Sequence, residues 1–296
     1  MRTKPIFTGA ATAIVTPMME NGAVDYEAFG RLIDWQIEEG INALVICGTT
    51  GEGSTLTDEE HKEVLEYAFK KANGRVPMIA GTGSNDTAYA IDLTKHACEI
   101  GYDGMLIVTP YYNKATQKGL IAMFTAIADA STKPLILYNV PSRTGVDIAV
   151  STYATLADHP NIAGIKEASG NISKIVELAA AVGDKVDIYS GNDDQIVPIL
   201  AIGGKGVISV LSNVAPKATV EMCDAYFKGD VKRSAQLQLD YIPLVKALFC
   251  EVNPIPVKAA TAALGFGGNY LRLPFTPMEE AHEAVLVAEM KKMGIL

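Results

Sequence analysis

The sequence lacks the features that mark several classes of protein. Its four cysteines form no CxxC pair and its four histidines form no HExxH motif, so neither a disulfide framework nor a metal site is predicted. No apolar run approaches the ~18 residues that a membrane helix needs, and the first residues show no signal-peptide core. We therefore expect a cytoplasmic protein with reduced thiols, no membrane span and no metal.

The sequence also contains fewer basic than acidic residues. The chain has 25 Lys and Arg against 34 Asp and Glu, a net charge of −9. Such a surface repels nucleic acid and anionic membranes, which leaves small molecules as the expected partners. The 296 residues are 49% hydrophobic, enough to bury the core of one large α/β barrel.

Short apolar runs recur along the chain, and most are followed by a segment with helical periodicity. Their starts are roughly 20 to 35 residues apart, close to the ~30 residues of a βαβ unit, whose strands are parallel. Eight such units predict a (β/α)8 TIM barrel. An open doubly wound sheet is the alternative, but the glycine fingerprint that usually follows its first strand is absent. The predicted strands are 11–17, 43–48, 77–81, 104–110, 134–139, 161–169, 185–191 and 206–210.

Helix signals accompany these strands and continue beyond them. One helix is expected to begin at Asp25, another at a capping box formed by Thr57 and Glu60, and residues 193–202 also read as helical. Further helices are predicted at 237–249, at 256–264 and from Thr276, the last with a second capping box at 276–279. We take residues 1–225 as the barrel and 226–296 as an appended helical region packed on it.

A lysine stands inside the predicted sixth strand. Strand alternation places Lys166 on one face with Gly164 and Ala168, with no carboxylate nearby in sequence on that face. Burial disfavours an ammonium and lowers its pKa, and the resulting neutral amine can form a Schiff base with a carbonyl. Taken alone, the strand favours the alternative of a lysine that reaches out to water.

The surrounding residues change that balance. In barrels of this kind the active site lies at the C-terminal ends of the strands. A phenol on the neighbouring strand, such as Tyr138, could move the protons that imine formation requires. Each residue also has a structural alternative, as a rim anchor, a turn residue or a solvated charge, but their position at one rim favours a shared site. The polar residues at this rim include Thr49, Thr50, Tyr111, Tyr112, Tyr138, Arg143, Lys166, Ser190 and Gly191.

Five further motifs can be recognised along the chain: Gly48-Thr-Thr-Gly-Glu52, Thr109-Pro-Tyr-Tyr-Asn113, Tyr138-Asn-Val-Pro-Ser-Arg-Thr-Gly145, Gly164-Ile-Lys-Glu-Ala-Ser-Gly170 and Asn253-Pro-Ile-Pro-Val-Lys258. Together they resemble the dihydrodipicolinate synthase family, in the order found in that family. The resemblance runs from about Thr8 to the C-terminus. It implies a class I aldolase-type condensation of pyruvate with aspartate semialdehyde on the route to diaminopimelate and lysine. It also implies a covalent lysine imine without a cofactor, and a homotetramer made of two tight dimers.

The same resemblance implies a role for each site residue. Lys166 forms the imine with pyruvate, and Tyr138 relays protons. Thr49 connects Tyr138 to Tyr112, which comes from a neighbouring subunit. The residues expected to bind substrate are Thr50 at the pyruvate carboxylate, Arg143 at the semialdehyde carboxylate, and Gly191 with the backbone of Ile208 at the pocket wall.

Two other functions stay open at this point. An N-acetylneuraminate lyase or a 2-keto-3-deoxy sugar-acid aldolase shares the lysine and tyrosine, but Arg143 suits a short aldehyde with a carboxylate better than a polyhydroxylated chain. A non-catalytic barrel with a binding or regulatory role is the second alternative. Loss of Lys166 or Tyr138 would mark that protein, and both are present.

The resemblance extends to a candidate site for inhibition by lysine. Lysine-inhibited family members bind the amino acid at the dimer interface, where Asp58 replaces an expected histidine and Tyr89 an expected glutamate. Without that glutamate the bound ammonium loses its charge partner, although Asp58 could supply a substitute carboxylate if its side chain turns inward. We therefore expect weak or absent inhibition. The matching residues are Ser54, Asp58, His61, Asn85, Tyr89 and Tyr111.

Overall fold

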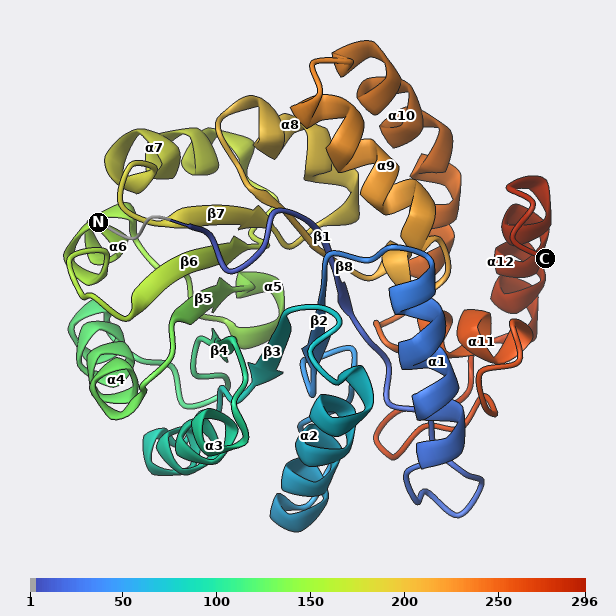
Figure 1. Ribbon diagram of the computed structural model, residues 1–296, viewed down its shortest axis with the longest axis horizontal. Coiled ribbons are helices and arrows are strands. Elements are labelled where there is room, and N and C mark those ends of the chain that lie inside the picture. The colour runs from blue at the N-terminus through green and yellow to red at the C-terminus, as the bar shows by residue number, and fades with distance from the viewer. Residues whose placement is uncertain (1–3) are drawn as a thin grey trace. The chain divides into compact units, whose positions relative to one another are not determined.

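Eight parallel strands follow one another in chain order in a closed barrel. The computed structural model describes residues 4–296 and is drawn in Figure 1. The strands confirm the predicted (β/α)8 barrel, although most end before the predicted runs do and the first begins earlier. Their bounds are β1 (Gly9–Ala13), β2 (Ala43–Ile46), β3 (Met78–Gly81), β4 (Gly104–Val108), β5 (Leu135–Asn139), β6 (Ile162–Glu167), β7 (Asp187–Ser190) and β8 (Gly206–Ser209).

Helices separate these strands and continue after the last one. The sequence signals described above predict neither the short helix α5 (Pro141–Thr144) nor α6 (Val150–Leu156). Both are too short to show a long apolar period in the sequence. The remaining helices are α1 (Tyr26–Glu38), α2 (Asp58–Ala72), α3 (Thr87–Ile100), α4 (Gln117–Ala130), α7 (Ile172–Val182), α8 (Ile196–Ala201), α9 (Pro216–Phe227), α10 (Val231–Leu248), α11 (Ile255–Ala263) and α12 (Glu280–Lys292).

The chain forms two compact units. One contains Pro77–Ile208 and the segment that ends at Gly9, and the other contains Ala10–Val76 and Ser209–Leu296. The proposed division into residues 1–225 and 226–296 stays a prediction, and α9 runs across it.

Local caps explain where several helices begin. Thr57 and Glu60 form the predicted capping box at the start of α2, with both reciprocal hydrogen bonds present. Asp25 caps α1 as expected, accepting from the amide of Ala28. The second predicted capping box, at 276–279, is wrong. Helix α12 begins at Glu280 instead, and the amide of Glu279 donates to the carboxylate of Glu251 at 3.0 Å.

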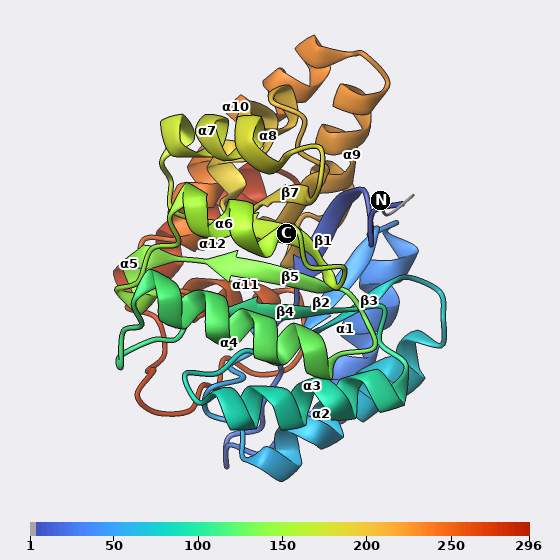
Figure 2. The same cartoon turned by 90° about the vertical axis from the view of Figure 1, so that its left-hand side faces the viewer.

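The strands of the first unit are buried on both faces, as parallel strands covered by helices are. Figure 1 shows β5, β6 and β7 side by side, with α4, α6 and α7 outside them, and Figure 2 shows these three helices on the side that faces the viewer. The strand register places Tyr138 beside Lys166 and Lys166 beside Tyr189. Because paired residues of neighbouring strands point to the same face, these three side chains share one side of the sheet.

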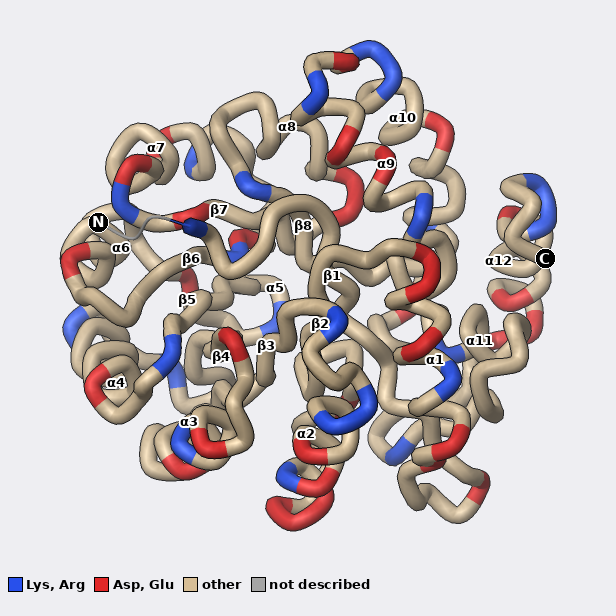
Figure 3. The backbone as a smooth tube through the Cα atoms, viewed as in Figure 1, with Lys and Arg blue, Asp and Glu red and all other residues tan. Residues whose placement is uncertain are grey.

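Charged residues are interspersed over the helices. Figure 3 shows Lys and Arg scattered among Asp and Glu along the helices. Among residues 4–296, no helix is long and apolar enough to cross a membrane.

Candidate active site

Lys166 is a buried amine held against an aromatic ring. It is the penultimate residue of β6 and only 6% exposed, and its Nζ lies 4.1 Å from the centroid of the Tyr138 ring. Burial lowers the pKa of Lys166 from 10.5 to about 7, the Asp193 carboxylate opposes this shift and the Arg143 guanidinium adds to it. A substantial fraction of the side chain is therefore the neutral, nucleophilic amine near neutral pH.

Asp193 is the carboxylate that the sequence did not reveal. It is buried at the start of a short 3-10 helix (Asp193–Gln195) that follows β7, within the stretch predicted to be helical. Its negative charge stabilises the ammonium form of Lys166. The two residues are far apart in sequence, so strand alternation around Lys166 could not predict this neighbour.

Arg143 is exposed on α5, and the end of β4 anchors that helix. Pro141 opens α5 and Gly145 ends it with φ of 68°, in the left-handed region that favours glycine. The hydroxyl of Thr109 donates to the hydroxyl of Thr144 at 3.1 Å, which ties the turn to the residue that follows β4. This anchoring places a positive charge where it acts on Lys166.

Gly191 and Ile208 belong to the same unit as Lys166. The amide of Gly191 donates to the carbonyl of Glu167 at 2.8 Å, and a Cβ on Gly191 would lie 2.6 Å from the Cβ of Ala168. Only glycine allows the loop after β7 to approach the end of β6 this closely. Ile208 is buried in β8.

A buried carboxylate supports the end of β6 from the opposite face. Because side chains alternate along a strand, Glu167 points away from the side that carries Lys166. It accepts hydrogen bonds from Asn139 Nδ2 at 3.0 Å, the Tyr153 hydroxyl at 3.1 Å and the Ser169 amide at 2.8 Å. The network joins β5, β6 and α6 directly behind the lysine. A glutamate next to a lysine inside an apolar strand was the sequence signal for it.

Thr49 and Thr50 lie in the second unit, in the loop that follows β2. Thr50 is 3% exposed, and its hydroxyl accepts a hydrogen bond from Asn253 Nδ2 at 3.0 Å. Thr49 is half-buried. Glu52, two residues after Thr50, forms a buried ion pair with Lys258 at 2.8 Å.

Tyr112 stands apart from the buried residues because its side chain is 91% exposed. Its φ of 72° lies in the left-handed region, which a tyrosine rarely adopts. Asn85 Nδ2 donates to the backbone carbonyl of neighbouring Tyr111 at 3.2 Å, and Asn113 Nδ2 donates to the carbonyl of Asn85 at 2.9 Å. These bonds fix the loop that presents the exposed phenol.

The candidate lysine-binding residues divide between the two units. Asn85 and Tyr111 meet in the first unit, where Tyr89 is half-buried on α3. Of the three in the second unit, Ser54 and Asp58 are exposed and His61 is buried on α2. Weak inhibition by lysine stays a prediction.

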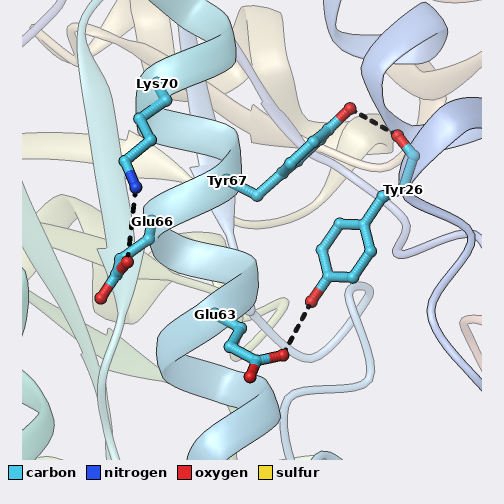
Figure 4. Close-up of a pocket in the computed structure, with 5 residues that line it drawn as sticks. All are labelled: Tyr26, Glu63, Glu66, Tyr67 and Lys70. Carbon is cyan, nitrogen blue, oxygen red and sulfur yellow. Dashed lines mark hydrogen bonds and ion pairs between the residues drawn. The ribbon is translucent and has the colours of Figure 1, made fainter.

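A surface pocket between α1 and α2 contains none of the predicted site residues. Figure 4 shows Tyr67 donating to the carbonyl of Tyr26, Tyr26 next to Glu63, and Lys70 next to Glu66. We do not assign the reaction to this pocket, because it holds no buried nucleophile. In the described part of the chain, no group of three His, Cys, Asp or Glu could hold a metal ion.

The model of the dihydrodipicolinate synthetase family matches residues 6–293. This chain belongs to that family. It is similar to the 4-hydroxy-tetrahydrodipicolinate synthase of Lachnoclostridium phytofermentans, at 56% identity over 98% of this chain and 99% of the relative. It is also similar to the synthase of Alkaliphilus oremlandii, at 54% identity over 98% of this chain and 100% of the relative.

Solved structures in the family agree with the fold. The chloride-inhibited dihydrodipicolinate synthase of Acinetobacter baumannii, complexed with pyruvate, matches with a TM-score of 0.96 and 46% identity over 98% of this chain and 99% of that chain. The resemblance inferred from the motifs is thereby confirmed. As a member of the dihydrodipicolinate synthetase family, the protein is an enzyme of the lyase class.

Proposed function

We propose that this protein condenses pyruvate with L-aspartate 4-semialdehyde through an imine on Lys166. The product is 4-hydroxy-tetrahydrodipicolinate, an intermediate on the way to lysine and diaminopimelate. The observation that carries the proposal is the buried Lys166 amine, with a pKa of about 7, held 4.1 Å from the centroid of the Tyr138 ring. Membership of the dihydrodipicolinate synthetase family supports the choice of substrates.

The chemistry follows from the neutral amine. Lys166 Nζ attacks the keto carbon of pyruvate, and loss of water from the carbinolamine gives the imine. The iminium withdraws electrons, so the methyl group loses a proton and becomes an enamine, which attacks the aldehyde carbon of the semialdehyde. The amine of the second substrate then attacks the imine carbon, closes the ring and releases Lys166, with one water lost overall. Tyr138 gives and takes the protons in these steps.

The remaining residues bind and orient the substrates. We assign the pyruvate carboxylate to Thr50 and the semialdehyde carboxylate to Arg143, because a guanidinium grips a carboxylate bidentately. The backbone of Gly191 and Ile208 lines the pocket, and Thr49 links Tyr138 to Tyr112 of a neighbouring subunit. The enzyme then works as a cytoplasmic homotetramer of two tight dimers. It needs no metal or organic cofactor, because the iminium itself accepts the electrons.

A coupled assay with pyruvate and a panel of aldehydes tests this function. We expect turnover with aspartate semialdehyde, and none with N-acetylmannosamine or glyceraldehyde. Turnover with N-acetylmannosamine would identify an N-acetylneuraminate lyase instead. Folded protein that turns over no aldehyde would contradict the proposal and favour a non-catalytic barrel.

A further inference from the structure

The segment from Asn253 to Arg272 braces the loop after β2. Lys258 on α11 pairs with Glu52 at 2.8 Å and donates to the carbonyl of Tyr270 at 2.7 Å, and both charged side chains are buried. The amide of Arg272 also donates to Glu52, at 3.3 Å. Removing two charges from water is costly, so such a pair is better understood as fixing a position than as adding stability.

The same segment holds the far end of that loop. Both guanidinium NH groups of Arg272 donate to the carboxylate of Glu60 at 2.6 Å, and further bonds reach the carbonyls of Gly22 and Thr55. This bidentate contact lowers the pKa of Glu60 to about 2. Contacts with Lys258 and Arg272 therefore fix both ends of the segment from Glu52 to Glu60. Thr50 lies two residues before this segment.

Asn253 then determines which way the Thr50 hydroxyl can donate. A threonine hydroxyl carries one proton and two acceptor lone pairs. Asn253 Nδ2 occupies one lone pair at 3.0 Å, and the two residues are 5% and 3% exposed. Because the amide donates to it, the hydroxyl proton of Thr50 has to point elsewhere.

We infer that Asn253 is a positioning residue, which orients the Thr50 hydroxyl as a donor to the pyruvate carboxylate and so favours an anionic 2-oxo acid over its neutral counterpart. The inference rests on the proposed function, in which Thr50 binds that carboxylate. It adds a residue that acts through Thr50 without touching the substrate, and it gives the C-terminal helical region a role in substrate selection.

The test uses borohydride trapping of the imine with two probes, pyruvate and pyruvamide, in which an NH2 group replaces the charged oxygen. Asn253→Asp keeps the shape of the side chain, but its carboxylate accepts the Thr50 proton and repels a second carboxylate. We expect the preference for pyruvate over pyruvamide, measured as trapping rates at subsaturating probe, to fall about tenfold or more. Asn253→Ala, which lacks the donor but adds no charge, should fall between the wild type and Asn253→Asp.

Asn42→Asp is the matched control. It adds the same charge to the same unit next to the other end of β2, and its side chain still accepts from the amide of Ala10, as Asn42 does at 2.8 Å. Its preference between the probes should match the wild type.

The possible outcomes separate this inference from the proposed function. An unchanged preference in both Asn253 variants would overturn this inference and leave the proposed function standing. An equal loss of trapping rate for both probes, together with a lower thermal midpoint, would also overturn it, because that result indicates a structural role for Asn253. If Asn253→Asp does not fold, the preference of Asn253→Ala decides by the same criterion. Wild-type protein that traps neither probe would overturn the proposed function, and the inference with it.

Discussion

Two opposite charges act on the single lysine at the centre of the proposed chemistry. The neutral amine is the nucleophile, so the rate of imine formation at subsaturating pyruvate should rise with pH through about 7, the pKa given by the environment of Lys166. Asp193→Asn removes a charge that favours the ammonium, and should shift this midpoint to lower pH. Arg143→Ala removes a charge that disfavours it, and should shift the midpoint to higher pH. Trapping rates measured from pH 5 to 10 give all three values.

Identical midpoints in the three proteins would show that neither charge changes the pKa of the Lys166 amine. A wild-type rate that shows no midpoint near 7 and still rises steeply at pH 10, as the ordinary lysine pKa of 10.5 requires, would show that Lys166 is hydrated rather than buried, and would contradict the proposed nucleophile.

Burial of the same lysine should also cost stability in a pH-dependent way. The pKa of Lys166 is about 7 in the folded protein and 10.5, the ordinary lysine value, in the unfolded chain. Between these values the unfolded chain binds more protons, so stability rises with pH. Below pH 7 the penalty is fully present, at about 1.4 kcal/mol per pKa unit and so several kcal/mol in all. Lys166→Met removes this penalty and also leaves the buried Asp193 without its cation, so the lysine's contribution is read from the pH dependence. Compared with the wild type, the thermal midpoint of Lys166→Met should be more favourable at pH 6 than at pH 9. A difference from the wild type that is constant, or that becomes more favourable with rising pH, would be inconsistent with a buried ammonium.

A site residue could be predicted from the sequence only where the residues near it in sequence indicate its role. Lys166 stood out because a charge inside an apolar strand breaks the local pattern, and Tyr138 followed from the adjacent strand. The effect of Asp193 on Lys166 and the hydrogen bond from Asn253 to Thr50 were not predicted, because only the folded chain brings these residues together. No spacing rule connects Thr50 to a residue 203 positions away.

At the scale of elements, the buried ion pair between Lys258 on α11 and Glu52 in the loop after β2 should be sensitive to the loss of the cation alone. Lys258→Met leaves the buried carboxylate of Glu52 without its cation and should cost about 3–5 kcal/mol of unfolding free energy. The double variant Lys258→Met/Glu52→Gln should recover part of that loss, because no charge is left buried. Denaturant unfolding measures both. Additive losses in the double variant would show that the two residues do not act as a pair.

An exposed ion pair provides the control for that experiment. Lys70 and Glu66 lie 3.6 Å apart on α2, with side chains 77% and 44% exposed. Surface pairs contribute little, so Lys70→Met should cost well under about 1 kcal/mol.

For the elements too, local sequence patterns were predictive and contacts between distant segments were not. The barrel strands and the capping box of α2 were predictable, because apolar runs and the Thr57–Glu60 spacing are local patterns. The second predicted capping box failed because Glu251, from a different segment, takes the amide of Glu279. Tertiary contacts of this kind override local preference and leave no periodic trace in the sequence.

At the scale of the whole molecule, the role proposed for Tyr112 links activity to assembly. Its phenol is 91% exposed in the single chain, which supports the proposal that it serves a neighbouring subunit. Tyr112→Phe should lower turnover, and mixing it with the inactive Lys166→Ala should restore part of the activity, because each mixed dimer contains one intact site. No rescue despite subunit exchange confirmed by native mass spectrometry would count against a shared site.

Trapping of the covalent intermediate tests the central claim most directly. Borohydride reduction in the presence of pyruvate, followed by peptide mass spectrometry, should add one pyruvate-derived group per chain, on the peptide that contains Lys166. Omitting pyruvate should abolish the modification. Modification of another lysine, or none in folded protein saturated with pyruvate, would contradict the assignment of Lys166 as the nucleophile.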